Sequence, residues 1–88
     1  MRVGEFNSHV FLLKIFSSCT IDENQCWNWN KYSDKDGYGK LTYQSKDWRV
    51  SRLVYTLLNG EILNNLLVLH KCDNSKCCNP AHIKLGTY

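Results

Sequence analysis

The residues with the most distinctive chemistry lie in one polar stretch near the carboxyl end of the chain. Cys72, Cys77 and His82 follow one another at the spacing Cys-x4-Cys-x4-His, and His70 precedes the first thiol by two residues. Zinc binds four sulfur or nitrogen ligands in a tetrahedron, so a tight loop with these side chains supplies three of the four. The spacing predicts a structural zinc site, and it leaves His70 free for a different role.

The fourth zinc ligand must come from outside this set, and Cys19, Cys26 and Cys78 are the candidates. Cys26 begins a predicted strand that can lie beside the loop. Cys78 adjoins Cys77, and neighbouring residues rarely both face one metal from a tight loop. Cys19 lies in a segment without strand character. Cys19 and Cys78 are also well explained as small buried apolar side chains.

Length, charge and cysteine content limit the classes of protein. The 88 residues suit one small domain, in which the core alone gives marginal stability and a metal staple is common. Five cysteines are an odd number, which argues against a complete disulfide framework and favours metal binding in a reducing cytoplasm. The net charge of +3 permits nucleic-acid binding without requiring it. The apolar run from Val10 to Phe16 is far shorter than the ~20 residues of a membrane span, so we expect no membrane anchor. Lys14 interrupts this run and no cleavage site follows it, so we expect no signal peptide.

Apolar periodicity and turn residues predict a small α+β fold that positions these side chains. A helix is expected over residues 9–18, facing inward through Val10, Leu13 and Phe16. We expect one domain over residues 1–88, in which residues 1–8 form a flexible N-terminus. The further expected elements are a loop over 20–25, a strand over 26–30, a turn at 34–37, a return strand over 38–43, a second turn near 45–46, a helix over 51–58 capped by Asn59-Gly60, a buried strand over 66–70 and a strand over 82–85.

Four motifs occur in the order and spacing of a known family. They are Cys26-Trp27-x-Trp29, Gly37-Tyr38-Gly39, Arg52 before a helix rich in Leu and Tyr, and Val68-x-His70-x-Cys72-Asp73-Asn74 followed by Cys77-x-Asn79-Pro80-x-His82 and Leu85-Gly86-Thr87. Together they resemble the HNH endonucleases of the His-Me finger (ββα-metal) superfamily, in the zinc-containing form of phage genomes and homing enzymes. The resemblance covers residues 26–88.

The resemblance implies roles for particular residues. Cys26 would complete the zinc site with the three loop ligands. His70 would be the general base that activates water for attack on a DNA phosphorus, with Mg²⁺ or Mn²⁺ required only if the chain is catalytic. Asn79 would hold the geometry of the loop or the imidazole, although capping a turn before Pro80 explains it equally well. Arg52 would belong to the catalytic set, and the basic side chains Lys46, Arg49, Arg52, Lys71 and Lys76 are candidates for phosphate contacts.

The end of the chain departs from the family pattern. HNH enzymes continue after the Leu-Gly-Thr turn into a helix that holds the catalytic ion, whereas this sequence stops at Tyr88, and Ser51-Arg52 replaces the usual His-Arg. We therefore expect a DNA-binding module rather than an efficient nuclease. One alternative is an active metal-dependent endonuclease. The other is a phage-encoded inhibitor of a host defence, of anti-CRISPR or anti-restriction type, that offers Ile83, Leu85 and Tyr88 to a protein partner.

Overall fold

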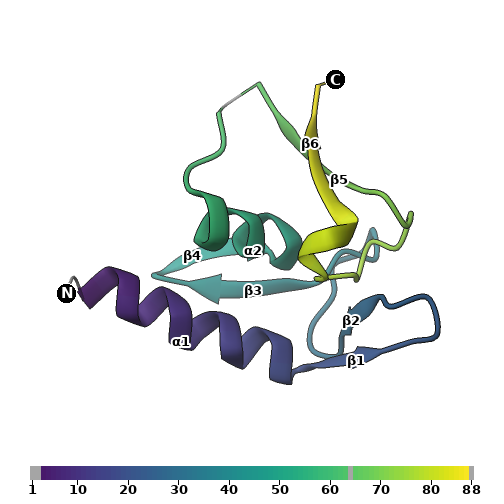
Figure 1. Ribbon diagram of the computed structural model, residues 1–88, viewed down its shortest axis with the longest axis horizontal. Helices are drawn as coiled ribbons and strands as arrows, with labels where there is room; N and C mark the ends of the chain where they lie inside the picture. Colours follow the sequence, from purple (N-terminus) through teal and green to yellow (C-terminus); the bar gives the residue numbers. More distant parts are fainter. Residues whose placement is uncertain (1–2, 64, 88) are drawn as a thin grey trace.

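The computed structural model describes residues 3–63 and 65–87, with side chains from residue 9 onward. Within these ranges the chain forms two α-helices, a short 3₁₀ turn and three separate two-stranded antiparallel sheets (Figure 1). None of these helices has the length and apolar character needed to cross a membrane. The α+β class predicted from the sequence is confirmed. The elements are α1 Val3–Ser17, β1 Cys19–Ile21, β2 Trp27–Trp29, β3 Lys40–Tyr43, β4 Lys46–Arg49, α2 Val50–Asn59, β5 Leu67–His70, η1 Pro80–His82 and β6 Ile83–Gly86.

The first helix is longer than predicted and faces the core partly through different residues. It begins at Val3 rather than at residue 9, while the flexibility expected of residues 1–8 stays a prediction. Its buried side chains are Leu12 and Ile15, whereas Leu13, expected to face inward, is 59% exposed. Phe16 packs against the core as expected. The prediction for Leu13 was wrong because apolar residues occupy several faces of this helix, so periodicity alone does not single out the buried one.

The segment expected as a polar loop over 20–25 begins with a strand. β1 pairs with β2, and Cys19 lies opposite Trp29. The connecting turn is closed at Asp22, whose backbone N–H donates to the carbonyl of Cys26 at 3.0 Å. Cys19 therefore has the strand conformation that the sequence did not indicate, because three residues are too few for a clear alternating pattern.

The turn at 34–37 is present, but the strands around it pair differently from the prediction. A single bridge between Ser33 and Gly39 closes the turn, and β3 then pairs with β4 rather than with β2. Gly39 lies against the indole of Trp29, and a Cβ added there would be 2.7 Å from Trp29 Cδ1. Only glycine fits this close approach of the backbone to a buried ring.

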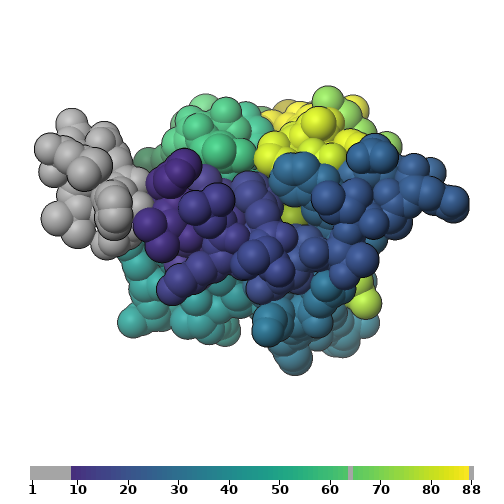
Figure 2. All heavy atoms as spheres, turned by 60° about the horizontal axis from the view of Figure 1, so that its bottom comes forward, coloured from purple at the N-terminus to yellow at the C-terminus, as the bar shows by residue number. Residues whose placement is uncertain are grey.

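The core lies where the two helices meet the sheets. Val50, Leu53 and Val54 of α2 are at most 1% exposed and pack with Leu12 and Ile15 of α1. Trp29, Cys78 and Ile83 belong to the same cluster. Figure 2 shows α1 lying across one face of the molecule, with α2 on one side of it and the β3–β4 hairpin on the other. The helix α2 ends at Gly60, which confirms the predicted cap.

The last two strands bring His70 next to the core. β5 pairs with β6, and His70 lies opposite Ile83. β5 is half-buried rather than buried as predicted, since Leu69 is 37% exposed. Ile83 is only 6% exposed, so the expectation that it would be offered to a partner was wrong, because its side chain fills the core. Leu85 is half-buried, and Tyr88 lies outside the described residues.

Candidate metal centre and histidine cavity

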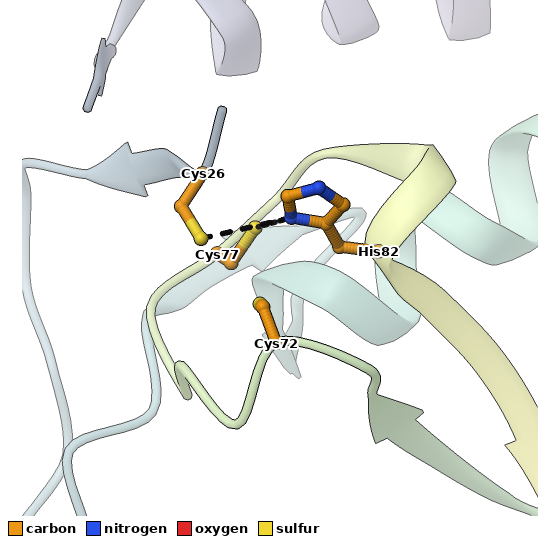
Figure 3. A group of neighbouring side chains, drawn as sticks. All are labelled: Cys26, Cys72, Cys77 and His82. Atoms are coloured by element: carbon orange, nitrogen blue, oxygen red, sulfur yellow. Dashed lines mark hydrogen bonds between the residues drawn. The ribbon is translucent and has the colours of Figure 1, made fainter. Parts of the chain in front are cut away.

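Four side chains suited to metal binding converge from distant parts of the chain: Cys26, Cys72, Cys77 and His82 (Figure 3). Their ligand atoms all lie within 4.8 Å of one another. Cys26 directly precedes β2, Cys72 and Cys77 lie in the loop after β5, and His82 ends η1. The structure thus brings together the three loop side chains and one of the three candidates for a fourth ligand, and the cluster could hold a metal ion.

The spacing of these atoms suits a tetrahedral ion. Nδ1 of His82 lies 3.6 Å from Sγ of Cys26 and 3.5 Å from Sγ of Cys77. Zinc bonds of about 2.3 Å to sulfur and about 2.0–2.1 Å to nitrogen, at the tetrahedral angle, separate sulfur from nitrogen by roughly 3.5–3.6 Å. The donor set and these two distances therefore fit zinc without rearrangement of the side chains concerned.

Burial controls the protonation of the thiols. Cys26 and Cys77 are 3% and 1% exposed. Burial raises the pKa of Cys77 to about 12, and burial likewise raises the pKa of Cys26. Without a cation these groups are neutral thiols at physiological pH, so binding a metal must release protons from them.

A polar network fixes the first ligand beside the loop. Asp22 Oδ1 accepts a hydrogen bond from the backbone N–H of Cys26 at 3.1 Å, and Oδ2 accepts one from Asn28 Nδ2 at 3.0 Å. The bond from Asn28, followed by that from Cys26, lowers the pKa of Asp22. Asn28 in turn accepts a hydrogen bond from Asn74 Nδ2 in the metal loop. The carboxylate therefore connects the turn before Cys26 to the loop that holds the other cysteines.

Backbone hydrogen bonds seat the loop on β2. The N–H of Trp29 donates to the carbonyl of Lys76 at 3.0 Å, and the N–H of Cys78 donates to the carbonyl of Trp27 at 2.8 Å. This pairing turns Cys78 into the core, where it is 1% exposed and outside the metal cluster. Cys19 is half-buried and outside the cluster too, with Sγ 3.3 Å from the carbonyl oxygen of Ile15. The packing role expected for both cysteines agrees with these positions.

His70 lies at the end of β5 beside a cavity of about 490 Å³. Its Nε2 is 3.2 Å from the carbonyl oxygen of Cys77. A carbonyl only accepts hydrogen bonds, so this contact requires the proton on Nε2, and in the neutral ring Nδ1 is then the unprotonated nitrogen. Burial lowers the pKa of His70, the Cys77 carbonyl opposes that shift, and the charge of Arg49 adds to it. The cavity is lined by Tyr38, Val68, Leu69, His70, Lys71, Asp73 and Lys84.

Two residues predicted to act with His70 do not line its cavity. Asn79 accepts a hydrogen bond from the backbone N–H of Ala81 at 3.0 Å and donates one to the carbonyl of Gln25 at 2.7 Å. These are the contacts of a residue that caps a turn, the second of the two predicted roles. Arg52 lines a different hollow, beside Lys46 and Trp48. The structure does not bring Arg52 to the cavity.

Sequence reasoning missed Asp22, Asn28 and Asn74, which hold the metal cluster together. Single polar residues in turns have no spacing rule that identifies a partner about fifty positions away. The Asp22-x3-Cys26 spacing is a weak signal of a side chain that caps a turn, and it acquires meaning only once the turn is known to precede a ligand.

Comparison with known proteins agrees with this site. Residues 49–88, which carry α2, the metal loop and His70, match the model of a family described as HNH endonuclease. The resemblance predicted from the motifs is confirmed over this segment. No solved structure matches the chain.

Two phage proteins are similar to most of this chain. "Protein 2.8" of Escherichia phage T7 is 31% identical over 78 residues, which cover 84% of this chain and 51% of that protein. "Protein 7.7" of the same phage is 32% identical over 62 residues, which cover 70% of this chain and 48% of that protein. The chain thus spans about half the length of the curated relatives it matches.

Proposed function

We propose that this chain is a zinc-stabilised module of the HNH type that binds DNA through the face around His70. The observation that carries the proposal is the cavity next to the metal cluster, where, within the described part of the chain, the two cations Lys71 and Lys84 outnumber the single carboxylate, Asp73. Phosphate neutralisation by lysine and arginine supplies most of the non-specific affinity of proteins for DNA. The match of this segment to an HNH endonuclease family supports the same ligand.

Zinc is the metal we assign to the cluster of three cysteines and one histidine. Closed sites with four sulfur or nitrogen ligands are typical of structural zinc, which has no open position for chemistry. Its role here would be to hold the loop of residues 72–82 against β2, and so to set the position of His70 at one side of the cavity. Because both curated relatives come from a bacteriophage, we place the activity in the cytoplasm of a bacterial host.

Hydrolysis of a phosphodiester is the second candidate, and the orientation of His70 favours it. The carbonyl of Cys77 faces Nε2, so Nδ1 of the neutral ring is the nitrogen that can accept a proton from water, and burial lowers the pKa of the ring. Among the described residues Asp73 is the one carboxylate that lines the cavity. These side chains do not by themselves make a Mg²⁺ or Mn²⁺ site, so we assign no step to such an ion.

Fluorescence anisotropy with a labelled DNA duplex tests the main proposal. We expect binding at low salt that weakens by more than about tenfold between about 50 and 200 mM salt, because counterion release drives it. Reversing the charge at both Lys71 and Lys84 should weaken binding, whereas the control Lys14→Glu, an exposed change on α1, should have little effect. Absence of binding at low salt would contradict the proposal and favour a protein partner, such as a host-defence complex.

The same preparation tests hydrolysis. Incubation with supercoiled plasmid and Mg²⁺ or Mn²⁺ should produce nicks that His70→Ala abolishes if the second candidate is correct. His70→Ala should leave the zinc content at one ion per chain, which separates a lost base from a lost fold. Nicking that persists in His70→Ala would exclude His70 as the base.

A further inference from the structure

Arg49 ends β4 and is the basic residue whose surroundings are most specific. Its guanidinium carbon lies 3.8 Å from the centroid of the Tyr38 ring, so the cation stacks on the aromatic face. Its Nε lies 3.8 Å from Oδ2 of Asp34, and the side chain is 46% exposed. At this distance the carboxylate attracts the charge without forming a direct hydrogen bond. Arg49 is therefore held in place and is still accessible from solvent.

The two residues that hold Arg49 are themselves fixed by the turn at 34–37. Asp34 Oδ1 accepts hydrogen bonds from the backbone N–H groups of Asp36 and Tyr38, at 2.9 and 3.0 Å. The backbone N–H of Asp34 donates to the carbonyl of Tyr38 at 2.8 Å. Ser75 Oγ donates to the carbonyl of Gly37 at 2.8 Å, which ties this turn to the metal loop. Little conformational entropy remains to be lost when a ligand meets the arginine.

Tyr38 also connects Arg49 to the histidine cavity. The rings of Tyr38 and His70 have centroids 6.2 Å apart, and both side chains line the cavity. Arg49 lies over the Tyr38 ring, so its charge stands close to the cavity that already contains Lys71 and Lys84.

The remaining donors of Arg49 point to the class of ligand. Arg49 contacts Tyr38 through the flat face of its guanidinium and Asp34 through Nε. Among the described side chains, neither contact uses its two terminal NH₂ groups. Two parallel N–H donors match the two free oxygens of a phosphodiester, which lysine cannot grip in the same bidentate way. We infer that Arg49 is a phosphodiester-binding residue beside the His70 cavity, and that Tyr38 and Asp34 are its positioning residues. This inference rests on the proposed function, since it names the residue that binds the DNA backbone.

The salt dependence of duplex binding tests the role of Arg49. Each phosphate contact contributes about 0.9 to the slope of log K against log salt, so Arg49→Gln should reduce the slope by about that amount. Arg49→Lys should keep the slope, because the charge remains, and should lower the affinity several-fold, because the bidentate geometry is lost. The matched control Lys14→Gln removes an exposed charge on α1 and should leave slope and affinity unchanged.

Tyr38 provides an independent readout of positioning. Tyr38→Leu removes the aromatic face and should weaken binding about two- to five-fold, whereas Tyr38→Phe keeps the face and should bind like the wild type. Thermal unfolding monitored by circular dichroism confirms that each variant folds.

The outcomes separate this inference from the proposed function. If the wild-type protein binds with a steep salt dependence and Arg49→Gln has the same slope, the inference is wrong and the DNA-binding proposal stands. Equal binding by the Leu and Phe variants of Tyr38 would remove the positioning role. If the wild-type protein does not bind DNA at low salt, both proposals fail.

Discussion

Asn79 shows how one motif residue supports two interpretations until its hydrogen bonds are known. In the family pattern it belongs to the catalytic motif, yet the two hydrogen bonds that its side chain makes within the described residues both go to backbone groups. One of them caps η1 and the other reaches Gln25, which precedes the first ligand. The side chain is 9% exposed, so these bonds are largely shielded from water.

Removing this side chain should therefore affect stability first. We expect Asn79→Ala to lower the free energy of unfolding by about 1–3 kcal/mol, since it removes a cap and leaves a carbonyl without its partner. Asn79→Asp keeps the acceptor for Ala81 but sets a carboxylate oxygen against the carbonyl of Gln25 at a buried position, so it should be at least as destabilising as Asn79→Ala. Urea denaturation of the metal-loaded protein measures both changes. Unchanged stability in Asn79→Ala would show that the turn forms without its cap.

The sequence was most informative at the scale of single residues wherever the signal was local. Cys72, Cys77 and His82 were found from their spacing because one short loop holds them, and the structure places them within reach of one ion. Cys26 could not be selected by spacing alone, because it lies 56 residues before His82 and several folds could bring either Cys19 or Cys26 to the loop. The expected strand at Cys26 favoured it over Cys19, and the resemblance to a family pointed to the same residue.

The elements differ in how clearly their residues encode them. The helix α2 was predicted within one residue at each end, because its apolar residues recur at helical spacing and Gly60 stops it. The pairing of β3 with β4 was missed, since Asp36-Gly37 gives a stronger hairpin signal than the turn actually used. That turn consists of Gln44 and Ser45, which have φ values of 52° and 64°. Two successive positive φ angles favour Asn and Gly rather than these residues.

Replacing this turn should stabilise the fold. The double variant Gln44→Asn with Ser45→Gly removes two unfavourable left-handed residues, and we expect the free energy of unfolding to rise by about 0.5–1 kcal/mol, or several degrees in the midpoint of thermal unfolding. Ser45→Ala retains a Cβ at positive φ and serves as the control, with no stabilisation expected. A double variant no more stable than the wild type would mean that other contacts of the turn outweigh its backbone preference.

At the scale of the whole molecule the metal cluster joins the start of β2 to the segment after β5 through side chains that lie outside the hydrophobic core. The three sheets are separate, and the loop that carries Cys72 and Cys77 contacts β2 through its backbone and the turn at 34–37 through Ser75. His70 and Tyr38, whose ring centroids lie 6.2 Å apart, both line the cavity. This architecture could not be predicted from local patterns, because it depends on contacts between residues far apart in the sequence.

Loss of the metal should therefore impair both stability and binding. We expect one zinc per chain, and a strong chelator should destabilise the protein by more than about 3 kcal/mol, since structural zinc contributes roughly 10 kcal/mol or more in zinc-finger peptides. Cys72→Ser should lose the metal, whereas Cys19→Ser, outside the cluster, should retain it. Elemental analysis and thermal unfolding measure these effects, and DNA affinity should fall together with metal content. A protein that remains folded with full DNA affinity after chelation would show that the cluster has no structural role.

The separation of Cys26 from the other three ligands sets the order in which the site can assemble. Cys26 is synthesised 56 residues before His82. During synthesis its thiol therefore has no partner ligands until most of the domain has been made. Cys72, Cys77 and His82 would hold the ion from one short segment, because little loop entropy separates them. Cys26 would complete the set from a distant part of the chain, and so would join the start of β2 to that segment. The complete four-ligand site can therefore form only after His82 has been synthesised, which places metal binding late in the folding of the chain.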